Sequence, residues 1–472
     1  MSERFQNLTR ILFARHEPSS VGGRLTRGAI HTFVLRAAYT GLSFVISLLL
    51  ARGLGTTGYG IYSYSLAWIL LLTVPATLGM DVLLTREVAT CEVASAWGSM
   101  RGLLRQAGFT VFIFSGGLVL AAFTVFCVLV RRADPQVAGA FSLAVVLLPL
   151  LSLTRVQQGV LQGLQRVGHA QLPAMLVHPV LLAGLLAAAL LLLRTKLTVS
   201  VAMGMNVLAT AFAFLLAVGL VRRSLPSAVR KIAPVYQELP WARSILPLVF
   251  ILSMVTVFGQ TDVLMVGFML GPKPVGIYSV ADRAAEFINL FQLTLNPALA
   301  PTFASLFAAK EMKQLQRVVT TSTRMTFLAA LLVGFAFIVF GGKILGFFYG
   351  PDFARGQRAL AILSVGQLIN VAAGPVGILL AMTRHERDAA WSLGISTAFN
   401  LILNRILIPI WGLEGSAVAA AVSLALLNVL SSVRVYRRLG IDSTVLGALG
   451  SHRGHRKGVF SPPETSGTIP RG

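Results

Sequence analysis

The chain has 472 residues, of which 55% are hydrophobic and 12% charged, and its mean hydropathy is +0.77. Soluble domains carry about 25% charged residues, so this composition excludes an ordinary globular enzyme. The apolar residues occur in long blocks, which also excludes a disordered chain and the weak alternation of an outer-membrane β-barrel. The sequence therefore predicts a polytopic α-helical membrane protein.

The chain is strongly basic, with 40 Lys and Arg against 17 Asp and Glu, a net charge of +23. The basic residues lie mainly between apolar blocks, where they act as topology signals and contact anionic lipid head groups, so we expect membrane lipids and no nucleic acid as partners. Cys91 and Cys127 indicate neither a disulfide framework nor a metal site, and no cofactor is expected. The first 28 residues lack the apolar core of a signal peptide.

Twelve apolar blocks are long enough to cross a bilayer, which takes about 20 residues. In chain order they are Ala29 to Leu50, Ile61 to Leu78, Gln106 to Val130, Ala138 to Leu153, Leu172 to Leu193, Leu197 to Val221, Ile245 to Met269, Val275 to Leu299, Met325 to Phe348, Ala359 to Met382, Ala390 to Ile410 and Gly415 to Val433. With the amino terminus inside, the inside segments hold 28 Lys and Arg, the outside loops nine and the spans three. This bias predicts a multi-pass membrane protein with both termini in the cytoplasm.

The spans divide six and six about a basic, proline-containing segment. The predicted domains are a cytoplasmic basic segment (1–28), an N-lobe (29–221), a cytoplasmic linker (222–243), a C-lobe (244–435) and a basic tail expected to be disordered (436–472). The outside loops are too short for an extracytoplasmic catalytic domain. Because GxxxxGK[ST], HExxH and GxSxG are also absent from the sequence, we do not expect an enzyme.

A short segment recurs in the two halves. Residues 54–63 read LGTTGYGIYS and residues 270–279 read LGPKPVGIYS, with six of ten positions identical at an offset of 216. Because this offset spans six helices, the halves insert in the same orientation and form a parallel repeat. The predicted fold is therefore all-α, with about 12 transmembrane helices in two six-helix lobes around a central cleft. Transporters that alternate access by rocking one lobe against the other use this architecture.

Polar and ionisable side chains inside the spans are candidates for function, because they are costly in a bilayer. Span one carries a polar stripe at helical spacing, formed by Thr32, Arg36, Thr40, Ser43 and Ser47. Spans seven, eight and eleven carry further groups, among them Gln260, Asp262, Asp282, Arg283, Glu286, Asn400, Asn404 and Arg405. The i,i+3 spacing of Arg283 and Glu286 allows an ion pair on one helix.

These groups predict a cleft with a modest positive bias and many hydroxyl and amide groups, suited to a ligand with an anionic head and a polar sugar portion. Arginine stays protonated when buried and presents a planar fork of donors to phosphate. The candidate substrate-binding residues are Arg36, Arg283, Arg405, Thr32, Thr40, Ser43, Asn400, Asn404 and Gln260. Asp262 and Glu286 are the candidates for coupling to a proton or sodium ion.

Structural alternatives remain open for each arginine. Arg36 could pair with Asp262 or an acid of span eight, Arg283 could be satisfied by Glu286 alone, and Arg405 could snorkel to the outer surface. The Ser, Thr and Asn residues are more often packing contacts than ligands. His178, between two prolines, is interpreted as hydrogen-bonded packing rather than a proton relay.

Two stretches resemble a known family. Residues 51–63, ARGLGTTGYGIYS, followed by Leu78-Gly79-Met80 and Arg86-Glu87-Val88, resemble the opening of bacterial polysaccharide flippases of the multidrug/oligosaccharidyl-lipid/polysaccharide exporter superfamily. Residues 262–281, DVLMVGFMLGPKPVGIYSVA, resemble the span seven to eight region of the same family. The resemblance extends from about residue 29 to 435, and it departs where many relatives have additional carboxyl-terminal spans.

The resemblance implies a flippase that moves an undecaprenyl-diphosphate-linked oligosaccharide from the cytoplasmic to the outer leaflet of the bacterial inner membrane, for lipopolysaccharide or exopolysaccharide export. Cationic residues of the central cavity, here Arg36 and Arg283, would then engage the diphosphate. Glycan polymerase machinery is a further expected partner. The alternatives are a lipid II flippase, a drug/cation antiporter of the same superfamily, which would need a net acidic cleft, and a membrane-embedded glycan polymerase.

Overall fold

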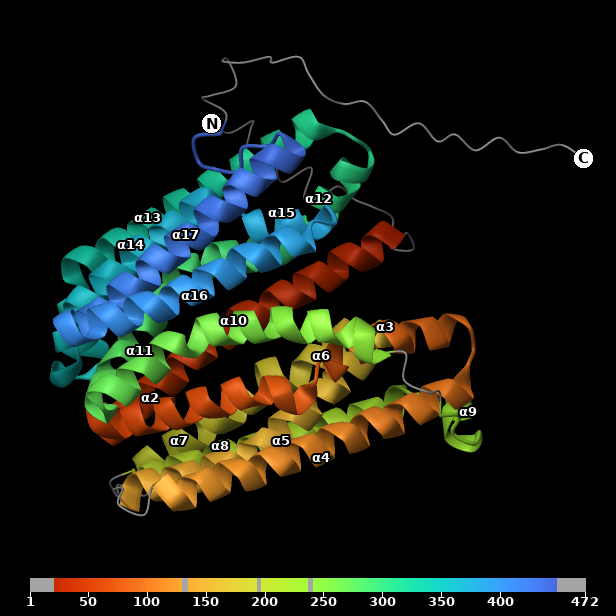
Figure 1. Ribbon diagram of the computed structural model, residues 1–472, viewed down its shortest axis with the longest axis horizontal. Helices are drawn as coiled ribbons and strands as arrows, with labels where there is room; N and C mark the ends of the chain where they lie inside the picture. Colours follow the sequence, from red (N-terminus) through yellow and green to blue (C-terminus); the bar gives the residue numbers. More distant parts are fainter. Residues whose placement is uncertain (1–20, 130–134, 193–196, 237–240, 448–472) are drawn as a thin grey trace, which may run out of the picture.

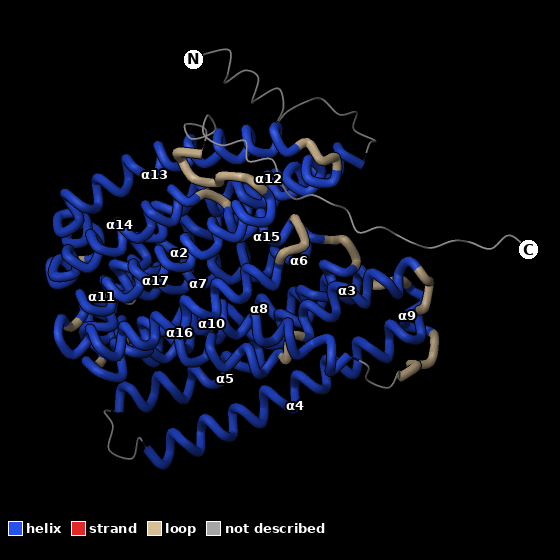
Figure 2. Tube along the Cα trace, turned by 45° about the horizontal axis from the view of Figure 1, so that its top comes forward, coloured by secondary structure: helices blue, strands red, loops and turns tan. Residues whose placement is uncertain are grey.

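The computed structural model describes residues 21–129, 135–192, 197–236 and 241–447, and this part of the chain forms helices and short connections without a strand. The helices are α2 (Val21–Thr77), α3 (Met80–Val93), α4 (Trp97–Leu129), α5 (Pro135–Gly163), α6 (Val167–Leu172), the π-helix η1 (Pro173–Val177), α7 (His178–Leu192), α8 (Val199–Ser224), α9 (Ser227–Lys231), α10 (Trp241–Leu270), α11 (Pro272–Glu286), the 3-10 helix η2 (Phe287–Asn289), α12 (Leu290–Ala308), α13 (Met312–Tyr349), the 3-10 helix η3 (Pro351–Gly356), α14 (Gln357–Ala373), α15 (Val376–Met382), α16 (Glu386–Trp411) and α17 (Leu413–Leu439). Figure 2 shows that the connections are short and lie at helix ends.

Ten stretches within the described residues are long and apolar enough to cross a membrane, which confirms the all-α membrane fold. The predicted number of twelve spans is not confirmed by length and composition. Predicted spans one and two form a single helix, α2, which kinks at Gly55 (φ 70°, ψ −177°). Predicted span eight is divided among α11, η2 and α12, and none of these three pieces is among the ten stretches.

The helices form two groups that meet along α2, α10 and α11 (Figure 1). We call residues 21–236 the N-terminal half and residues 241–447 the C-terminal half. The end of the bundle at the left of Figure 1, where Gly55 and Gly271 redirect the chain, is named the hairpin end. The opposite end, where α2 begins and α17 ends, is named the terminal end.

The repeated segments pack directly against each other across the two halves. Gly60 of α2 and Gly276 of α11 occupy equivalent positions at the offset of 216. A Cβ atom at Gly60 would lie 1.8 Å from the carbonyl oxygen of Pro272, and one at Gly276 would lie 2.0 Å from that of Thr56. Only a residue without a side chain allows two backbones to approach so closely. The sequence repeat therefore corresponds to a glycine-mediated contact between the halves.

Two segments predicted to lie outside the lobes, the linker and the tail, are packed against the helices. In the predicted linker, Val235 donates its backbone N–H to the carbonyl of Gly98 on α4 at 3.0 Å. In the predicted tail, the backbone of Asp442 makes two hydrogen bonds with the Gln316 amide, at 2.6 and 2.8 Å, and Ile441 is buried. The expectation of disorder is thus wrong for residues 436–447, and the rest of the tail lies outside the described residues.

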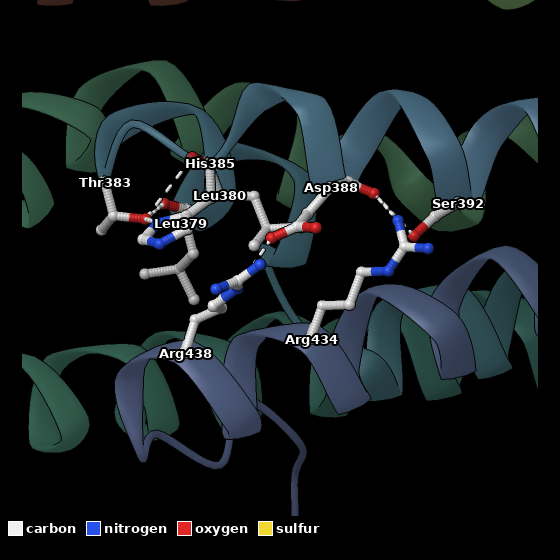
Figure 3. A network of polar contacts seen from close by, with 8 residues as sticks. All are labelled: Leu379, Leu380, Thr383, His385, Asp388, Ser392, Arg434 and Arg438. Carbon is white, nitrogen blue, oxygen red and sulfur yellow. Dashed lines mark hydrogen bonds and ion pairs between the residues drawn. The ribbon is translucent and has the colours of Figure 1, made fainter.

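Helices α16 and α17 are joined at the terminal end by Asp388 (Figure 3). Its carboxylate accepts a hydrogen bond from Arg438 Nε at 3.1 Å, and its carbonyl accepts from Arg434 and, at 3.0 Å, from the Ser392 hydroxyl. Asp388 also lies in the first turn of α16, where a negative charge interacts favourably with the helix dipole. One residue therefore stabilises both the start of α16 and the end of α17.

We expect Asp388→Ala to lower the free energy of unfolding by about 1 kcal/mol, since it removes a partly exposed ion pair and a first-turn charge but leaves the backbone carbonyl in place. Thermal unfolding of the purified protein in detergent measures this loss. Glu386→Ala is the matched control, because Glu386 lies in the same first turn but is exposed and outside the network of Figure 3. Equal losses in the two variants would contradict a role for the Arg438 contact.

Candidate functional site

A cavity of about 240 Å³ lies between the two halves, and we name it the central cavity. Side chains from α2, α7, α8, α10 and α11 line it. Its polar lining consists of Tyr39, Ser43, Ser47, Tyr59, Tyr62, Ser63, His178, Asn206, Gln260, Ser279, Asp282, Arg283 and Glu286. A ligand in this position contacts both halves, as alternating access requires.

The charged groups of the central cavity come from one helix. On α11, Arg283 Nη1 lies 3.2 Å from Glu286 Oε2, which confirms the i,i+3 pair. The two side chains are 46% and 52% exposed, so the pair faces open space. Asp282 also lines the cavity. The described lining thus holds one arginine and two carboxylates, and the predicted positive bias of the cleft is wrong for this part of it.

A hydrogen-bonded chain crosses the wall of the N-terminal half. The Asn206 amide of α8 donates to Tyr62 Oη at 2.8 Å, and its Oδ1 lies 2.9 Å from His178 Nε2. Because an amide oxygen can only accept, the His178 ring is the donor in this contact. His178 follows directly on the π-helix η1, an irregular turn of the kind often found at functional sites. The histidine is therefore both hydrogen-bonded, as predicted, and part of the cavity wall.

The central cavity is closed off toward the hairpin end by contacts between α2 and α13. Arg52 donates from Nε and Nη2 to the carbonyls of Phe348 and Phe347, both at 2.6 Å. Ser47 Oγ lies 3.1 Å from Tyr349 Oη. The ring of Phe44 packs edge-on against Phe287, Phe348 and Tyr349, with centroids 5.0 to 5.8 Å apart. Together with the Gly60–Gly276 contact, these interactions seal the halves at this end.

A second polar centre surrounds Asp262 on α10. Its Oδ1 accepts hydrogen bonds from Asn400 and Asn404 of α16 at 3.1 and 2.7 Å. Asn404 Oδ1 in turn accepts from the Ser416 hydroxyl of α17 at 2.8 Å. In the part of the chain that is described, these bonds to Asp262 come from neutral amides, so an Arg36–Asp262 ion pair finds no support. The charge of this carboxylate is therefore stabilised by the dipoles of the two amides rather than by a cation.

The Asp262 centre and the central cavity adjoin each other. A neighbouring cavity of about 180 Å³ is lined by Asp262 and Tyr278, and also by Asp282 and Glu286, which line the central cavity as well. The two carboxylates of α11 therefore lie between a site open to ligand and the partly buried carboxylate of Asp262. This arrangement can transmit a change in charge from one side of α11 to the other.

The structure brings together some of the predicted site residues and separates others. Ser43, Gln260, Arg283 and Glu286 line the central cavity. Asn400 and Asn404 are fully buried and belong to the Asp262 centre. The other candidates lie elsewhere, with the Thr40 hydroxyl donating to the carbonyl of Arg36, Arg405 exposed on α16, and the Thr32 side chain outside the described residues.

Several cavity residues were missed by the sequence analysis. Tyr59 and Tyr62 lie within the repeated motif, so the repeat itself is a signal for them. Asn206 is the one side-chain amide in the mostly apolar helix α8, and an isolated amide gives little signal in a sequence. Asp282 is among the polar groups of the spans but not among the candidate site residues, yet it lines both cavities.

Solved structures with the same fold are transporters. The chain is similar to the inward-facing conformation of a multidrug resistance MATE family transporter of the MOP superfamily, with a TM-score of 0.70, 14% identity, and 86% of this chain and 98% of that chain covered. It is also similar to a MOP superfamily transporter from Pyrococcus furiosus, with a TM-score of 0.63, 12% identity, and 92% and 98% of the two chains covered. The fold is therefore that of a MOP-superfamily transporter.

Residues 25–307 match the family model described as polysaccharide biosynthesis protein, and the chain belongs to this family. Residues 247–407 also match the MatE model. Two relatives are the Haloferax volcanii protein named "Probable low-salt glycan biosynthesis flippase Agl15" (25% identity; 86% of this chain, 82% of the relative) and the Shigella flexneri protein named "Putative O-antigen transporter" (23%; 80% and 89%). The resemblance to polysaccharide flippases is confirmed.

Proposed function

We propose that this protein flips a prenyl-diphosphate-linked oligosaccharide from the cytoplasmic to the outer leaflet of the bacterial inner membrane, and that the prenyl carrier is undecaprenyl. The observation that carries the proposal is Arg283, a cation on the wall of a cavity between two repeated halves in a chain of the polysaccharide biosynthesis family. Relatives named as glycan flippase and O-antigen transporter support the class of substrate.

Arg283 can exchange one anionic partner for another. Its guanidinium contacts Glu286 through a single nitrogen at 3.2 Å in an open cavity, whereas a diphosphate offers several anionic oxygens that can accept two hydrogen bonds from the guanidinium. Binding of the diphosphate would displace the Glu286 carboxylate, which is then free to take up a cation or a proton. Arg36, on the same helix face as Ser43 but nearer the terminal end, would contact the anion earlier on its path.

The positive-inside bias assigns the terminal end to the cytoplasm and the hairpin end to the outside. The conformation with its hairpin end sealed by Arg52, Phe44 and the Gly60–Gly276 contact is then the one that receives substrate from the cytoplasm. Transport requires these contacts to separate while new ones form at the terminal end. We expect the glycan polymerase machinery to take over the product on the outer side.

We further propose that Asp262 binds the coupling ion, a proton or sodium. The Asp262 carboxylate is hydrogen-bonded to two neutral amides and lines the same cavity as Glu286. An added cation would stabilise it, because no cationic side chain compensates its charge among the contacts described. Asp262→Asn keeps the shape and one acceptor oxygen for Asn400 and Asn404 but removes the charge. We expect uptake by proteoliposomes to lose its dependence on the imposed ion gradient. A gradient dependence that persists in the variant would exclude Asp262 as the coupling site.

The second candidate is a drug/cation antiporter. The two carboxylates that line the central cavity with a single arginine favour it, and so does the match to the MatE model. This function predicts that a deletion strain becomes sensitive to cationic compounds while its surface glycan stays normal.

A deletion strain tests the proposed function. Its lipids are extracted, the prenyl-diphosphate-linked oligosaccharide is quantified, and a membrane-impermeant probe reports how much of it is reachable from outside. We expect the full-length lipid-linked precursor to accumulate and to be unreachable from outside. Normal surface glycan with cation sensitivity would instead establish the antiporter and remove the diphosphate role of Arg283.

A further inference from the structure

A third cavity, of about 300 Å³, lies within the C-terminal half and shares no lining residue with the two cavities described above. Residues of η2, α12, the α14–α15 connection, α16 and α17 line it. Its polar lining is made almost entirely of side-chain amides, namely Asn289, Gln292, Asn296, Asn370 and Asn428, together with Ser431. We name it the amide cavity. None of the described residues that line it carries a charge.

Two amide oxygens of this lining have no hydrogen-bond partner within the described protein. Gln292 is 7% exposed, yet its Oε1 accepts no hydrogen bond, and the same holds for Asn289 Oδ1. Elsewhere in the lining, Asn428 donates to Asn370 Oδ1 at 3.0 Å. A buried acceptor left unpaired costs about 1 to 3 kcal/mol. The amide cavity is therefore a place where a donor from a ligand gains hydrogen bonds that the protein does not supply to itself.

Two interrupted spans meet at the amide cavity. One is predicted span eight, which changes to the 3-10 helix η2 at Phe287–Asn289. The other is predicted span ten, which breaks at Gly374 (φ 82°, ψ −167°) and Pro375 between α14 and α15. Irregular backbone at membrane depth is tolerated where it lines a cavity, and discontinuous helices often form the binding sites of transporters. The backbone thus indicates a ligand site independently of the amides.

These features are not inherited from the internal repeat. At the offset of 216, Gln292 corresponds to Ala76 in the N-terminal half. The helix of predicted span four, α5, runs unbroken over Pro135–Gly163, whereas span ten is broken. The fold that the two halves share does not require features that occur in only one of them. Its asymmetry favours a specific role in recognition.

The lining defines the chemistry of the ligand. Amides donate and accept, as hydroxyl groups do, and the absence of charge from the described lining disfavours an anion or a cation. Leu293, Val376, Leu393 and Leu427 add apolar contact for carbon–hydrogen surface. A volume of about 300 Å³ lies at the lower end of the range for small-molecule sites. These properties suit an uncharged, polyhydroxylated ring.

We propose that the amide cavity binds a sugar ring of the transported glycan while the diphosphate of the same molecule occupies the central cavity at Arg283. Glu286 lines the central cavity and Asn289, three residues further along the same span, lines the amide cavity, so the two sites lie about one helical turn apart on this span. The inference rests on the proposed function, since it assigns the sugar portion of that substrate to its own subsite.

Binding of two lipids to the full-length protein in nanodiscs tests the inference. One probe is undecaprenyl diphosphate without sugar, and the other is the glycan-bearing prenyl diphosphate purified from a host strain that lacks this gene. We expect Gln292→Leu and Asn289→Leu each to lower the affinity for the glycan-bearing lipid about tenfold, which corresponds to the loss of one hydrogen bond. The affinity for the bare lipid should stay unchanged. Unchanged binding of the bare lipid also shows that the variants are folded.

Gln106→Leu on α4 is the matched control. Gln106 also has a buried amide oxygen without a partner, but it lines none of the three cavities described. We expect this variant to bind both lipids as the wild type does. If both amide-cavity variants keep wild-type affinity for the glycan-bearing lipid, the cavity holds only water and the inference is overturned.

The same experiment separates this inference from the proposed function. If the wild type binds both lipids equally tightly, the sugar contributes nothing and the inference fails while the flippase function stands. If the wild type binds neither lipid, the proposed function fails first. If Gln106→Leu and Gln292→Leu lowered the affinity for the glycan-bearing lipid equally, the inference would also be overturned, because the loss of any buried amide would then have the same effect.

Discussion

Replacing Arg283 by alanine is expected to abolish export of the lipid-linked glycan while the protein remains inserted in the membrane. Arg283 is the cation of the described central-cavity lining, and each charge-assisted hydrogen bond to a phosphate that is lost costs about tenfold in affinity or more. The measurement is the amount of surface glycan in a deletion strain that is complemented with the variant, at matched protein level in the membrane.

The matched control for this result is Arg405→Ala. Arg405 is also an arginine within a predicted span, but it is exposed on α16 and does not line the central cavity. We expect this variant to export glycan normally. Arg283→Lys distinguishes charge from geometry, because lysine keeps the charge but loses the planar fork of donors. Normal export by Arg283→Ala would contradict the role of the cavity in diphosphate binding.

The fold class and the approximate positions of most apolar spans could be predicted from the sequence. Long apolar blocks and glycine turns are local signals, and the repeated GIYS segments lie where the two halves meet. Helix breaks inside spans were harder to predict, since neither Gly374-Pro375 nor Phe287–Asn289 interrupts the hydrophobic pattern. A count of spans by apolar length therefore misses these interruptions, which depend on how the backbone packs around the amide cavity.

The charge of the cleft could not be predicted from residues counted per span. Arg36, Arg283 and Arg405 all lie within spans, but the rotation and depth of each helix decide which of them meets the cavity. The structure brings one of the three to its wall and adds two carboxylates from the same helix. Likewise, Asn400 and Asn404 have the spacing of a ligand-binding face, yet their amides are used by Asp262. Long-range contacts set these assignments.

The glycine contact that closes the hairpin end is expected to be essential for efficient glycan export. A Cβ atom at Gly276 would lie 2.0 Å from the Thr56 carbonyl oxygen, and one at Gly60 would lie 1.8 Å from the Pro272 carbonyl oxygen. Both neighbours are backbone atoms and cannot rotate away, so even alanine forces the halves apart. We expect Gly276→Ala and Gly60→Ala to destabilise the conformation that is sealed at the hairpin end, and glycan export to fall about tenfold or more, since overpacking of about 1 to 3 kcal/mol acts on this one conformation.

Thiol labelling reports the conformational part of this effect. In a background without Cys91 and Cys127, Ser43→Cys places a reporter on the wall of the central cavity. We expect a membrane-impermeant reagent added outside the cell to label it faster when Gly276→Ala is present. Gly204→Ala is the matched control, because a Cβ atom there meets nothing within 4 Å. If Gly276→Ala exports glycan and labels as the control does, the glycine contact is not part of the gate, and the repeat reflects common ancestry of the halves rather than their movement.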